Sequence, residues 1–574
     1  MERSRAAGQL LLLLGRVTGR HRRGGAKPGG VERTDVLSCV RPLAASKLAP
    51  VKRRFNTTGP CRPDWHYMVP AEARIPEAAG LVDQLGYFVI HAPRQTGKTT
   101  AIRALAARLT ASGQYAAVVL DCEEGGVAGD DYGSAQRAVL RDLARSAEID
   151  LPPELRPPPF SLEGDEALVI TALTAWARAC PLPLVLFFDE IDALRGQGLL
   201  SVLRQLRAGF PSRPGNFPAS VILCGLRDVR DYKAASGGDP ERMGTSSPFN
   251  IKIASLRIGD FSREELRALY AEHTKDSGQI FTEAALTRVE ELTAGQPWLV
   301  NALGREIVEK LAVPPDERVT AAHVDRAKER LILARATHLD SLISKLVEPR
   351  VHRVIGPLLS GNFEGTDDAY ADDVAYVRDL GLVAPQRPLR IANPIYREVI
   401  ARVLASNAEE RIPASPASFV LPDGRLAFRR LLRAFAAFWR EHGEVLASGM
   451  PYPEVAPQLV LMAFLQRVVN GGGFIDREYG VGRGRIDLLV RFPHAKPGGG
   501  RAVQRRALEL KVWRKGRKDP LGEGLAQIDD YLARLRLGRG TLVIFDARGR
   551  LARRAPRFDE VRTVGGRVVT VLRA

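Results

Sequence analysis

Residues 92–99, APRQTGKT, place a lysine and a hydroxyl at the end of a short polar loop. This stretch fits the GxxxxGK[ST] phosphate-loop template at every defined position except the first, where Ala92 replaces glycine. In such loops backbone N–H groups surround the phosphates, the lysine neutralises them and the hydroxyl holds Mg²⁺. We assign Lys98 and Thr99 to these last two roles, at the start of a helix whose unpaired amides add to the anion site. The residues expected to contact the phosphates are Arg94, Gln95, Thr96, Gly97, Lys98, Thr99 and Thr100.

A pair of acids ends the continuous apolar run LPLVLFFDEID. A buried parallel strand presents its functional groups at its C-terminal edge, beside the phosphate loop. Asp189 is therefore expected to hold the Mg²⁺ water shell, and Glu190 to orient or deprotonate the water that attacks the γ-phosphate. The loop alone would also fit a strand-to-helix turn with a surface lysine. The loop and the acidic strand together favour a site for ATP and Mg²⁺.

Two carboxylates and a lysine recur on strand-like runs near the C-terminus. Asp487 lies in RIDLLV, and Glu509 and Lys511 alternate around Leu510 in ELK. Period-two geometry places Glu509 and Lys511 on one face of their strand. Such a set can form a Mg²⁺ site with an ammonium beside the attacking water, as phosphodiester hydrolysis requires. An Asp in a strand and an exposed ExK tripeptide are also common without a catalytic role.

The elements around these residues resemble the PD-(D/E)XK nuclease pattern. Helical runs are followed by the glycine-rich hairpin NGGGFIDREYGVGRGRIDLLVRF, the strand RRALELKVW, the helix GLAQIDDYLARL and the strand TLVIFDARGR. Gln527 and Tyr531 lie four residues apart, on one helix face, and match the QxxxY extension of many such nucleases. Glu454 is a further carboxylate candidate. The resemblance implies catalytic roles for Asp487, Glu509, Lys511, Gln527 and Tyr531, with Asp487 and Glu509 as metal ligands.

Four ordered motifs, HAPRQTGKTT, LFFDEID, GLRDVRDYK and AGQPWLVNAL, resemble the prokaryotic AAA-like ATPases of the STAND branch of P-loop NTPases. The likeness covers about residues 51–400. It implies that Pro297, in the Gly-x-Pro of a helical lid, lies against the adenine. Just past the strand in ASVILCGLRDVRDYK, Arg227 is the candidate sensor of the γ-phosphate, with Arg230 second. Both also fit as surface charges or ion-pair partners.

Residues 336–408 read as helix, helix, short strand and helix, which resembles a winged-helix module. Such a module can insert its second helix into a major groove. Here the corresponding stretch DDVAYVRDL is acidic, where a helix that reads DNA should be basic. The resemblance to STAND-type proteins implies instead that the module closes the nucleotide site, and we favour this regulatory role.

The predicted fold class is α/β: a P-loop parallel sheet with a helical lid and winged helix, then a restriction-endonuclease-like α/β domain. Residues 54–76, rich in turn formers and aromatics, are expected to cover the base; His66 and Tyr67 could stack there or pack against the sheet edge. The predicted segments are a disordered arm or misassigned start (1–50), the ATPase core (51–255), the lid (256–335), the winged helix (336–408), a linker (409–424) and the nuclease-like domain (425–574).

Composition limits the function classes. A chain of 574 residues, 45% hydrophobic and 26% charged, is globular and too long for a single core. Its net charge of +18 favours a polyanionic partner, and we expect nucleic acid, in particular DNA. No apolar run is long enough to cross a bilayer, so no membrane partner is expected. Five scattered cysteines without CxxC spacing indicate a reducing cytoplasm and no zinc site.

Two functions from different classes follow. The first is an ATP-binding switch coupled to a Mg²⁺-dependent nuclease-like effector that acts on nucleic acid, with homo-oligomerisation on activation as a fitting option. The alternative is an ATP-regulated DNA-binding or scaffold protein whose nuclease fold does not cleave. A translocating repair motor is disfavoured, since no helicase motif and no clear arginine finger are found.

Overall fold

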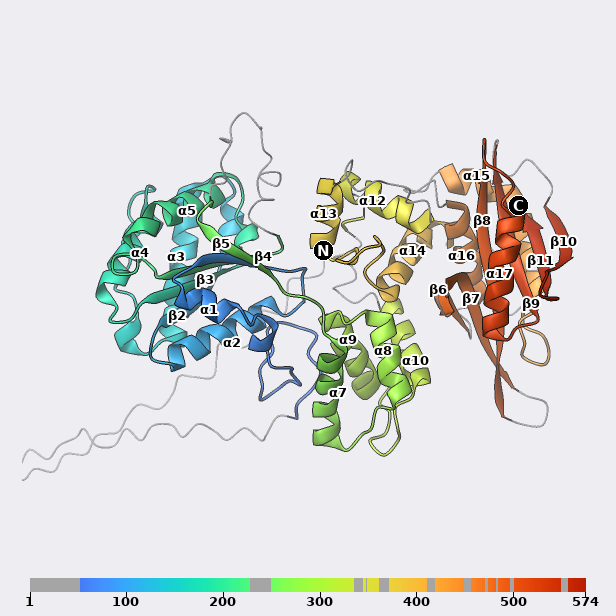
Figure 1. Cartoon of the computed structure of the whole chain (residues 1–574), viewed down its shortest axis with the longest axis horizontal. Helices are drawn as coiled ribbons and strands as arrows, with labels where there is room; N and C mark the ends of the chain where they lie inside the picture. Colours follow the sequence, from blue (N-terminus) through green and yellow to red (C-terminus); the bar gives the residue numbers. More distant parts are fainter. Residues whose placement is uncertain are drawn as a thin grey trace, which may run out of the picture. The chain divides into compact units, whose positions relative to one another are not determined.

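Apolar runs between residues 87 and 257 form a five-stranded parallel sheet in the computed structural model of the chain (Figure 1), in the order β2-β3-β4-β1-β5. The strands are β1 (Tyr87–His91), β2 (Ala116–Asp121), β3 (Leu184–Asp189), β4 (Ser220–Gly225) and β5 (Lys252–Arg257). The first four were predicted as strands from their continuous apolar character. β5 was not, because it pairs only with β1 at the sheet edge and alternates exposed and half-buried residues.

The structure describes residues 52–227, 249–334, 344–346, 348–360, 371–409, 419–448, 456–469, 473–481, 484–495, 500–548 and 556–574. The predicted N-terminal arm, most of the predicted linker, Arg230 and Glu454 lie outside these residues. None of the described helices combines the length and the apolar character of a membrane-spanning helix.

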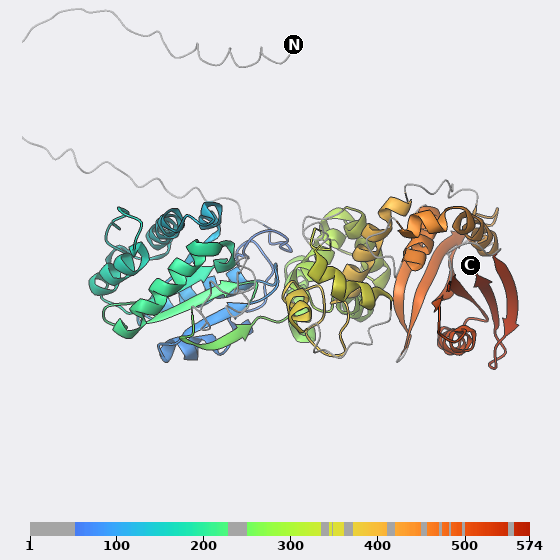
Figure 2. The same cartoon turned by 90° about the horizontal axis from the view of Figure 1, so that it is seen from above.

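Helices cover both faces of the parallel sheet, as Figures 1 and 2 show. One face packs against α1 and α2 through side chains such as Ile90 and Ile102. The other face packs against three helices through side chains such as Val118 and Leu203. Strand side chains alternate between the two cores. Because the helices cover the faces of the sheet, the C-terminal ends of the strands remain accessible for function. The helices are α1 (Ala78–Asp83), α2 (Lys98–Ala111), α3 (Tyr132–Asp150), α4 (Leu168–Ala179) and α5 (Gly196–Gly209).

The chain after β5 is mostly helical up to residue 409, as predicted. The Ser262 hydroxyl accepts from the Glu265 backbone N–H, and the Glu265 carboxylate accepts from the Ser262 N–H, forming a capping box. A β-bridge between Val383 and Ile391 lies between α13 and α14. The helices are α7 (Arg263–Ser277), α8 (Glu283–Thr293), α9 (Pro297–Arg305), α10 (Ala321–Leu333), α12 (Pro349–Ser360), α13 (Ala371–Asp379) and α14 (Pro394–Glu409).

A second, mixed sheet forms the C-terminal region, with the strand order β10-β11-β9-β8-β7-β6. Its elements up to β9 follow the predicted order; β10 and β11 were not predicted. β8, β9 and β11 run parallel, whereas β6, β7 and β10 pair antiparallel to their neighbours. The elements are α15 (Phe428–Ser448), α16 (Ala456–Val469), β6 (Phe474–Val481), β7 (Gly484–Ala495), β8 (Arg501–Arg514), α17 (Leu521–Leu535), β9 (Arg539–Ala547), β10 (Arg557–Arg562) and β11 (Val568–Arg573).

The two faces of the mixed sheet carry different helices. Leu508 and Val543 point to the face covered by α15 and α16. Leu489, Ala507 and Leu542 point to the opposite face, covered by α17. In the following text these are the α15 face and the α17 face.

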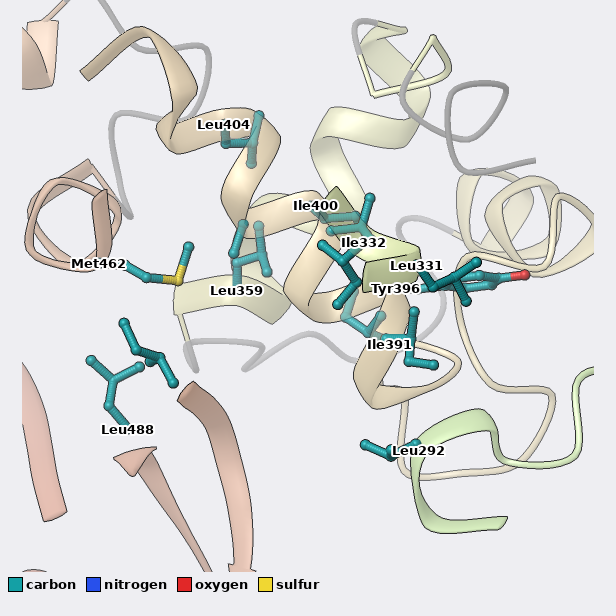
Figure 3. Packing of buried hydrophobic residues seen from close by; sticks show 14 of the residues in the cluster. Leu292, Leu331, Ile332, Leu359, Ile391, Tyr396, Ile400, Leu404, Met462 and Leu488 are labelled. Atoms are coloured by element: carbon teal, nitrogen blue, oxygen red, sulfur yellow. The ribbon is translucent and has the colours of Figure 1, made fainter. Parts of the chain in front are cut away.

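Helices α8 and α10, the α12–α14 segment, α16 and the C-terminal sheet share one hydrophobic cluster. Figure 3 shows members of it, including Leu292 of α8, Leu331 of α10, Ile400 of α14, Met462 of α16 and Leu488 of β7. Buried apolar surface contributes roughly 25 cal/mol per Å², so these elements stabilise one another.

Buried charges reinforce this contact. Asp476 of β6 is 7% exposed and accepts hydrogen bonds from Arg491 of β7 at 2.6 and 3.2 Å. Lys328 of α10 lies 3.5 Å from the same carboxylate, and Arg491 also donates to Asp325 of α10 at 2.9 Å. Helix α10 is therefore joined to β6 and β7 by a paired and hydrogen-bonded ion cluster.

We expect Asp476→Ala to lower the free energy of unfolding by about 3 kcal/mol, because Arg491 and Lys328 then lose their shared buried counter-ion. Denaturant unfolding measures this loss. Asp530→Ala is the control, since Asp530 lies in an exposed i,i+4 pair with Arg534 and should cost no more than about 0.5 kcal/mol. Equal losses in both variants would contradict a stabilising role of the buried cluster.

Candidate functional site

The predicted phosphate loop, residues 92–99, joins β1 to α2 at the C-terminal edge of the parallel sheet. Gly97 is the N-cap of α2 with φ +92°, a backbone conformation that residues other than glycine rarely adopt. Lys98 is 5% exposed, and its Nζ donates to the Ala92 carbonyl at 3.2 Å. The lysine ammonium is thus held within the loop at the N-terminus of a helix.

The hydroxyl and carboxylate predicted to face Mg²⁺ lie side by side. Thr99 Oγ1 donates to Asp189 Oδ2 at 2.6 Å. Asp189 ends β3 and is 3% exposed. Hydroxyl and carboxylate oxygens suit a hard cation, so the donor set of this corner fits Mg²⁺ next to the phosphate loop.

Glu190 follows directly and has a left-handed backbone, with φ +48°. Its Oε1 lies 3.8 Å from Lys98 Nζ, so the carboxylate points to the phosphate-loop lysine. Burial raises the pKa of the Glu190 carboxyl, and the nearby Lys98 opposes this rise. A non-glycine residue in this conformation is typical of functional sites that store backbone strain.

A cavity of about 120 Å³ adjoins the loop and is large enough to receive part of a ligand. Residues 56–59 and 67–69 line part of it, and the prediction that this segment covers the base stays a prediction. Thr96, Gly97 and Pro297 also line it. The further phosphate-contact candidates Gln95 and Thr100 line the same cavity. Arg94 is exposed on the loop.

Two alternatives were predicted for His66 and Tyr67, stacking on the base or packing against the sheet edge. Tyr67 is 2% exposed and packs against Phe55 and against His273 of α7. The His66 Nδ1 accepts from the Arg62 backbone N–H. Of these two residues, Tyr67 lines the cavity, and its ring is held between Phe55 and His273 of α7.

Arg74 is a residue of this site that the sequence prediction missed. Its Nη1 donates to the Thr96 carbonyl of the phosphate loop at 2.5 Å, and its Nη2 donates to the Gly259 carbonyl between β5 and α7. The guanidinium also lies over the Phe261 ring. Arg74 lies in a short 3₁₀ helix without any motif, so no sequence signal could have pointed to it.

The α13 segment contacts the same corner. The Arg227 guanidinium lies 4.4 Å from the centre of the Tyr376 ring of α13, and Arg257 donates to the Arg378 carbonyl at 3.2 Å. A side chain on Gly381 would come within 2.8 Å of Pro93 in the phosphate loop. Arg227 therefore faces α13, and its predicted contact with a γ-phosphate stays a prediction.

The C-terminal candidates gather on the α17 face. Asp487 shares this face with Leu489, and its Oδ2 accepts from the Leu510 backbone N–H at 2.7 Å. Glu509 and Lys511 lie on the same face, with Lys511 Nζ 3.3 Å from Glu509 Oε1. Asp487, Glu509 and Lys511 are thus brought together from two neighbouring strands.

The α17 helix adds polar groups to this cluster. A Cβ at Gly524 would meet Leu542 at 2.7 Å, so glycine here permits a close approach of the helix to the sheet. Glu523, which the sequence prediction missed, accepts from Lys511 at 3.2 Å and from Gln527 Nε2 at 3.3 Å. Tyr531 is half-buried against the core of the α17 face.

Two oxygens in this cluster suit a cation. Among the described residues, Glu509 Oε2 and Gln527 Oε1 are buried without a hydrogen-bond partner. Burial and the neighbouring Asp487 raise the pKa of Glu509 to about 8, against the opposing effect of Lys511. The described residues contain no group of three or more His, Cys, Asp or Glu side chains arranged for a metal. Asp487 and Glu509 supply two carboxylates, a donor set that suits a Mg²⁺ ion which keeps several waters.

Comparisons with known proteins address the N-terminal part of the chain. A family model described as an AAA domain matches residues 83–232. No curated protein sequence matches the chain. The residues matched by the family model contain the phosphate loop, Asp189 and Glu190, together with four of the five parallel strands.

Three solved structures illustrate the structural similarity. A Walker-type ATPase of Pyrococcus abyssi has 13% identity and a TM-score of 0.43, covering 60% of this chain and 99% of its own. The RuvB Holliday junction branch migration motor of Thermotoga maritima has 14% identity and a TM-score of 0.32, covering 57% and 92%. Cdc6p of Pyrobaculum aerophilum has 14% identity and a TM-score of 0.34, covering 62% and 97%.

The family match and the geometry of the loop agree. The parallel sheet positions Lys98, Thr99 and Asp189 at one strand edge, and the matched residues include all three. Residues 83–232 of this chain therefore form an AAA-type P-loop ATPase domain.

Proposed function

We propose that this protein is an ATP-dependent switch of the STAND type that controls a Mg²⁺-dependent, nuclease-like C-terminal domain acting on nucleic acid. The observation that carries the proposal is the convergence of Asp487, Glu509 and Lys511 on one face of a mixed sheet. A phosphate-loop domain and a candidate phosphodiester site in one chain support a switch and its effector. The described cysteines are free thiols, and we include a cytoplasmic location in the proposal.

In the nucleotide site, Lys98 neutralises the phosphates, and Thr99 and Asp189 hold Mg²⁺. Glu190 orients and deprotonates the attacking water. Pro297 and the segment at residues 56–59 enclose the base, since both line the cavity beside the loop. The Glu190 carboxylate lies 3.8 Å from Lys98 Nζ. When ATP binds, Lys98 would contact the phosphates, and Glu190 would contact the attacking water.

In the C-terminal site, Asp487 and Glu509 bind Mg²⁺ and Lys511 holds the attacking water by hydrogen bonding. When bound, Mg²⁺ supplies Lewis-acid stabilisation of the charge that develops on the phosphodiester. Gln527 keeps Glu523 in place through its Nε2, which positions the partner of Lys511. Release of Lys511 from Glu523 would make its ammonium available to the reacting water.

Contacts within the protein support control of one site by the other. The α13 segment, in the proposed winged-helix module, approaches the phosphate loop at Pro93 and contacts Arg227 just after β4. The lid helix α10 is bonded to β6 and β7 through the Asp476 cluster, and β7 also carries Asp487. A nucleotide-dependent movement of the lid would therefore act on a strand of the effector site. Homo-oligomerisation on activation is part of this proposal.

One observation favours the alternative of a binding domain that does not cleave. Lys511 is paired with both Glu509 and Glu523, and a paired ammonium is not free for catalysis. A plasmid-nicking assay with Mg²⁺, with and without ATP, separates the two functions. Cleavage that requires Mg²⁺ and responds to ATP supports the switch-and-effector proposal, whereas DNA binding without cleavage under both conditions supports the alternative.

We expect Glu190→Gln to retain ATP binding and to lower the rate of ATP hydrolysis about 10²–10³-fold, because the amide cannot accept a proton from the attacking water. Phosphate release at saturating ATP measures the rate, and calorimetry measures the affinity. Glu163→Gln, at an exposed loop position, is the control and should behave as wild type. Undiminished hydrolysis by the Glu190 variant would remove this residue from its assigned role.

A further inference from the structure

A cationic depression lies on the α15 face of the mixed sheet, with a volume of about 360 Å³. Five arginines and a single acid line it: Arg425, Arg429, Arg430, Arg506, Arg539 and Glu560. We name this set the arginine pocket. Such an excess of guanidinium groups around one depression favours an anionic ligand.

The pocket is separate from the carboxylate site. Arg506 and Glu509 lie on the same strand but alternate in direction, so Arg506 points to the α15 face and Glu509 to the α17 face. Three residues along a strand correspond to about 10 Å. The pocket also includes Thr541 and Thr570, whose strands β9 and β11 pair in parallel.

One guanidinium nitrogen in the pocket lacks an acceptor. Among the described residues, the buried Nε of Arg506 has no hydrogen-bond partner. Burial, together with the charges of Arg539 and Arg425, lowers the pKa of Arg506. A buried donor without a partner is unfavourable, because it has lost its hydrogen bonds to water. An anion bound beside Arg506 would satisfy the donor and relieve the repulsion among the arginines.

The walls of the pocket are held in place independently of any ligand. Gln504 of β8 donates to the Leu426 carbonyl at 3.0 Å and accepts from the Leu426 N–H at 2.8 Å. These bonds fix the turn that carries Arg425 against the sheet. Arg429, at the start of α15, lies 3.4 Å from Glu560 of β10, which leaves the acid of the pocket partly neutralised.

We infer that the arginine pocket binds phosphate groups of a nucleic-acid strand, as a second contact region outside the carboxylate site. Guanidinium groups bind phosphate oxygens in bidentate geometry, which makes arginine well suited to the sugar–phosphate backbone. Arg425, Arg429, Arg430 and Arg539 are exposed around the half-buried Arg506, and this spread fits successive phosphates better than one free ion. Backbone contacts of this kind position a strand without reading its sequence.

The double variant Arg506→Gln/Arg539→Gln tests the inference in the full-length protein. The probe is a short fluorescein-labelled single-stranded oligonucleotide, and its anisotropy is followed in EDTA over a series of salt concentrations. We expect an affinity loss of about tenfold or more, and a salt-dependence slope smaller by about 1.4, since each lost phosphate contact contributes about 0.7 for single strands. EDTA prevents cleavage during the binding measurement, and cleavage is tested separately by plasmid nicking with Mg²⁺. A protein that binds the strand in EDTA but does not cut DNA in Mg²⁺ would refute the nuclease proposal and leave the pocket standing.

The matched control is Arg505→Gln/Arg536→Gln, which removes the same charge. Arg505 is the neighbour of Arg506 and donates to the Leu535 carbonyl on the α17 side, and Arg536 follows the end of α17. An equal affinity loss in both double variants, or no strand binding by wild type, would overturn the inference. Calorimetry with inorganic phosphate tests whether the pocket instead binds a free phosphate ion. If Arg506→Gln/Arg539→Gln loses phosphate binding but binds the strand like wild type, the pocket is a site for a free anion and the inference of strand binding is refuted.

Discussion

Replacement of Lys98 by alanine is expected to weaken ATP binding about 100-fold or more. Each hydrogen bond between a charged donor and a phosphate oxygen contributes about 1.5–3 kcal/mol, and a lysine can make more than one. Lys98 is buried in the phosphate loop at the first position of α2. Alanine is a good helix former, so the variant should fold and lose only the ammonium.

Isothermal titration calorimetry with ATP measures the effect, and thermal unfolding without nucleotide checks the fold. Lys275→Ala is the matched control, because Lys275 is exposed on α7 and its loss should leave ATP affinity unchanged. Unchanged affinity in the Lys98 variant would remove the premise of a phosphate site at residues 92–99.

Lys511→Met is expected to lower Mg²⁺-dependent cleavage of nucleic acid about 10²–10³-fold, the usual effect of deleting one positioned donor at a developing charge. Methionine preserves the length of the side chain, and the ion pairs with Glu509 and Glu523 disappear. Because Lys511 lies outside the nucleotide site, ATP hydrolysis should continue at the wild-type rate. This split between two activities distinguishes a catalytic effect from unfolding.

Plasmid nicking at saturating DNA and phosphate release from ATP are measured on the same preparation. Lys310→Met, at an exposed position after α9, is the control and should retain both activities. Cleavage by the Lys511 variant at the wild-type rate would show that the predicted site is wrong, even if the protein proved to be a nuclease.

Much of both sites could be predicted from local patterns. The phosphate loop is contiguous in sequence, and continuous apolar runs identify β1 to β4 as buried parallel strands. Period-two geometry places Glu509 and Lys511 on one face before any coordinates are known. The structure adds that Asp487 of the neighbouring strand lies on the same face.

Features that depend on contacts between distant segments could not be predicted. Arg74 reaches the phosphate loop from an unremarkable turn, and Glu523 reaches Lys511 only because α17 packs against β8 and β9. β5 and β10 are edge strands with exposed faces, so their polar residues hide the strand signal. Arg506 reads as one more arginine in a basic stretch until its strand neighbours are known.

The position of Arg74 has a mechanical consequence. One planar group holds two backbone carbonyls that belong to different segments, Thr96 in the nucleotide-binding loop and Gly259 ahead of α7. A guanidinium is rigid and cannot stretch, so the two carbonyls must shift together or one hydrogen bond must break. A displacement of the loop on nucleotide binding would in this way be transmitted directly to the backbone just before α7.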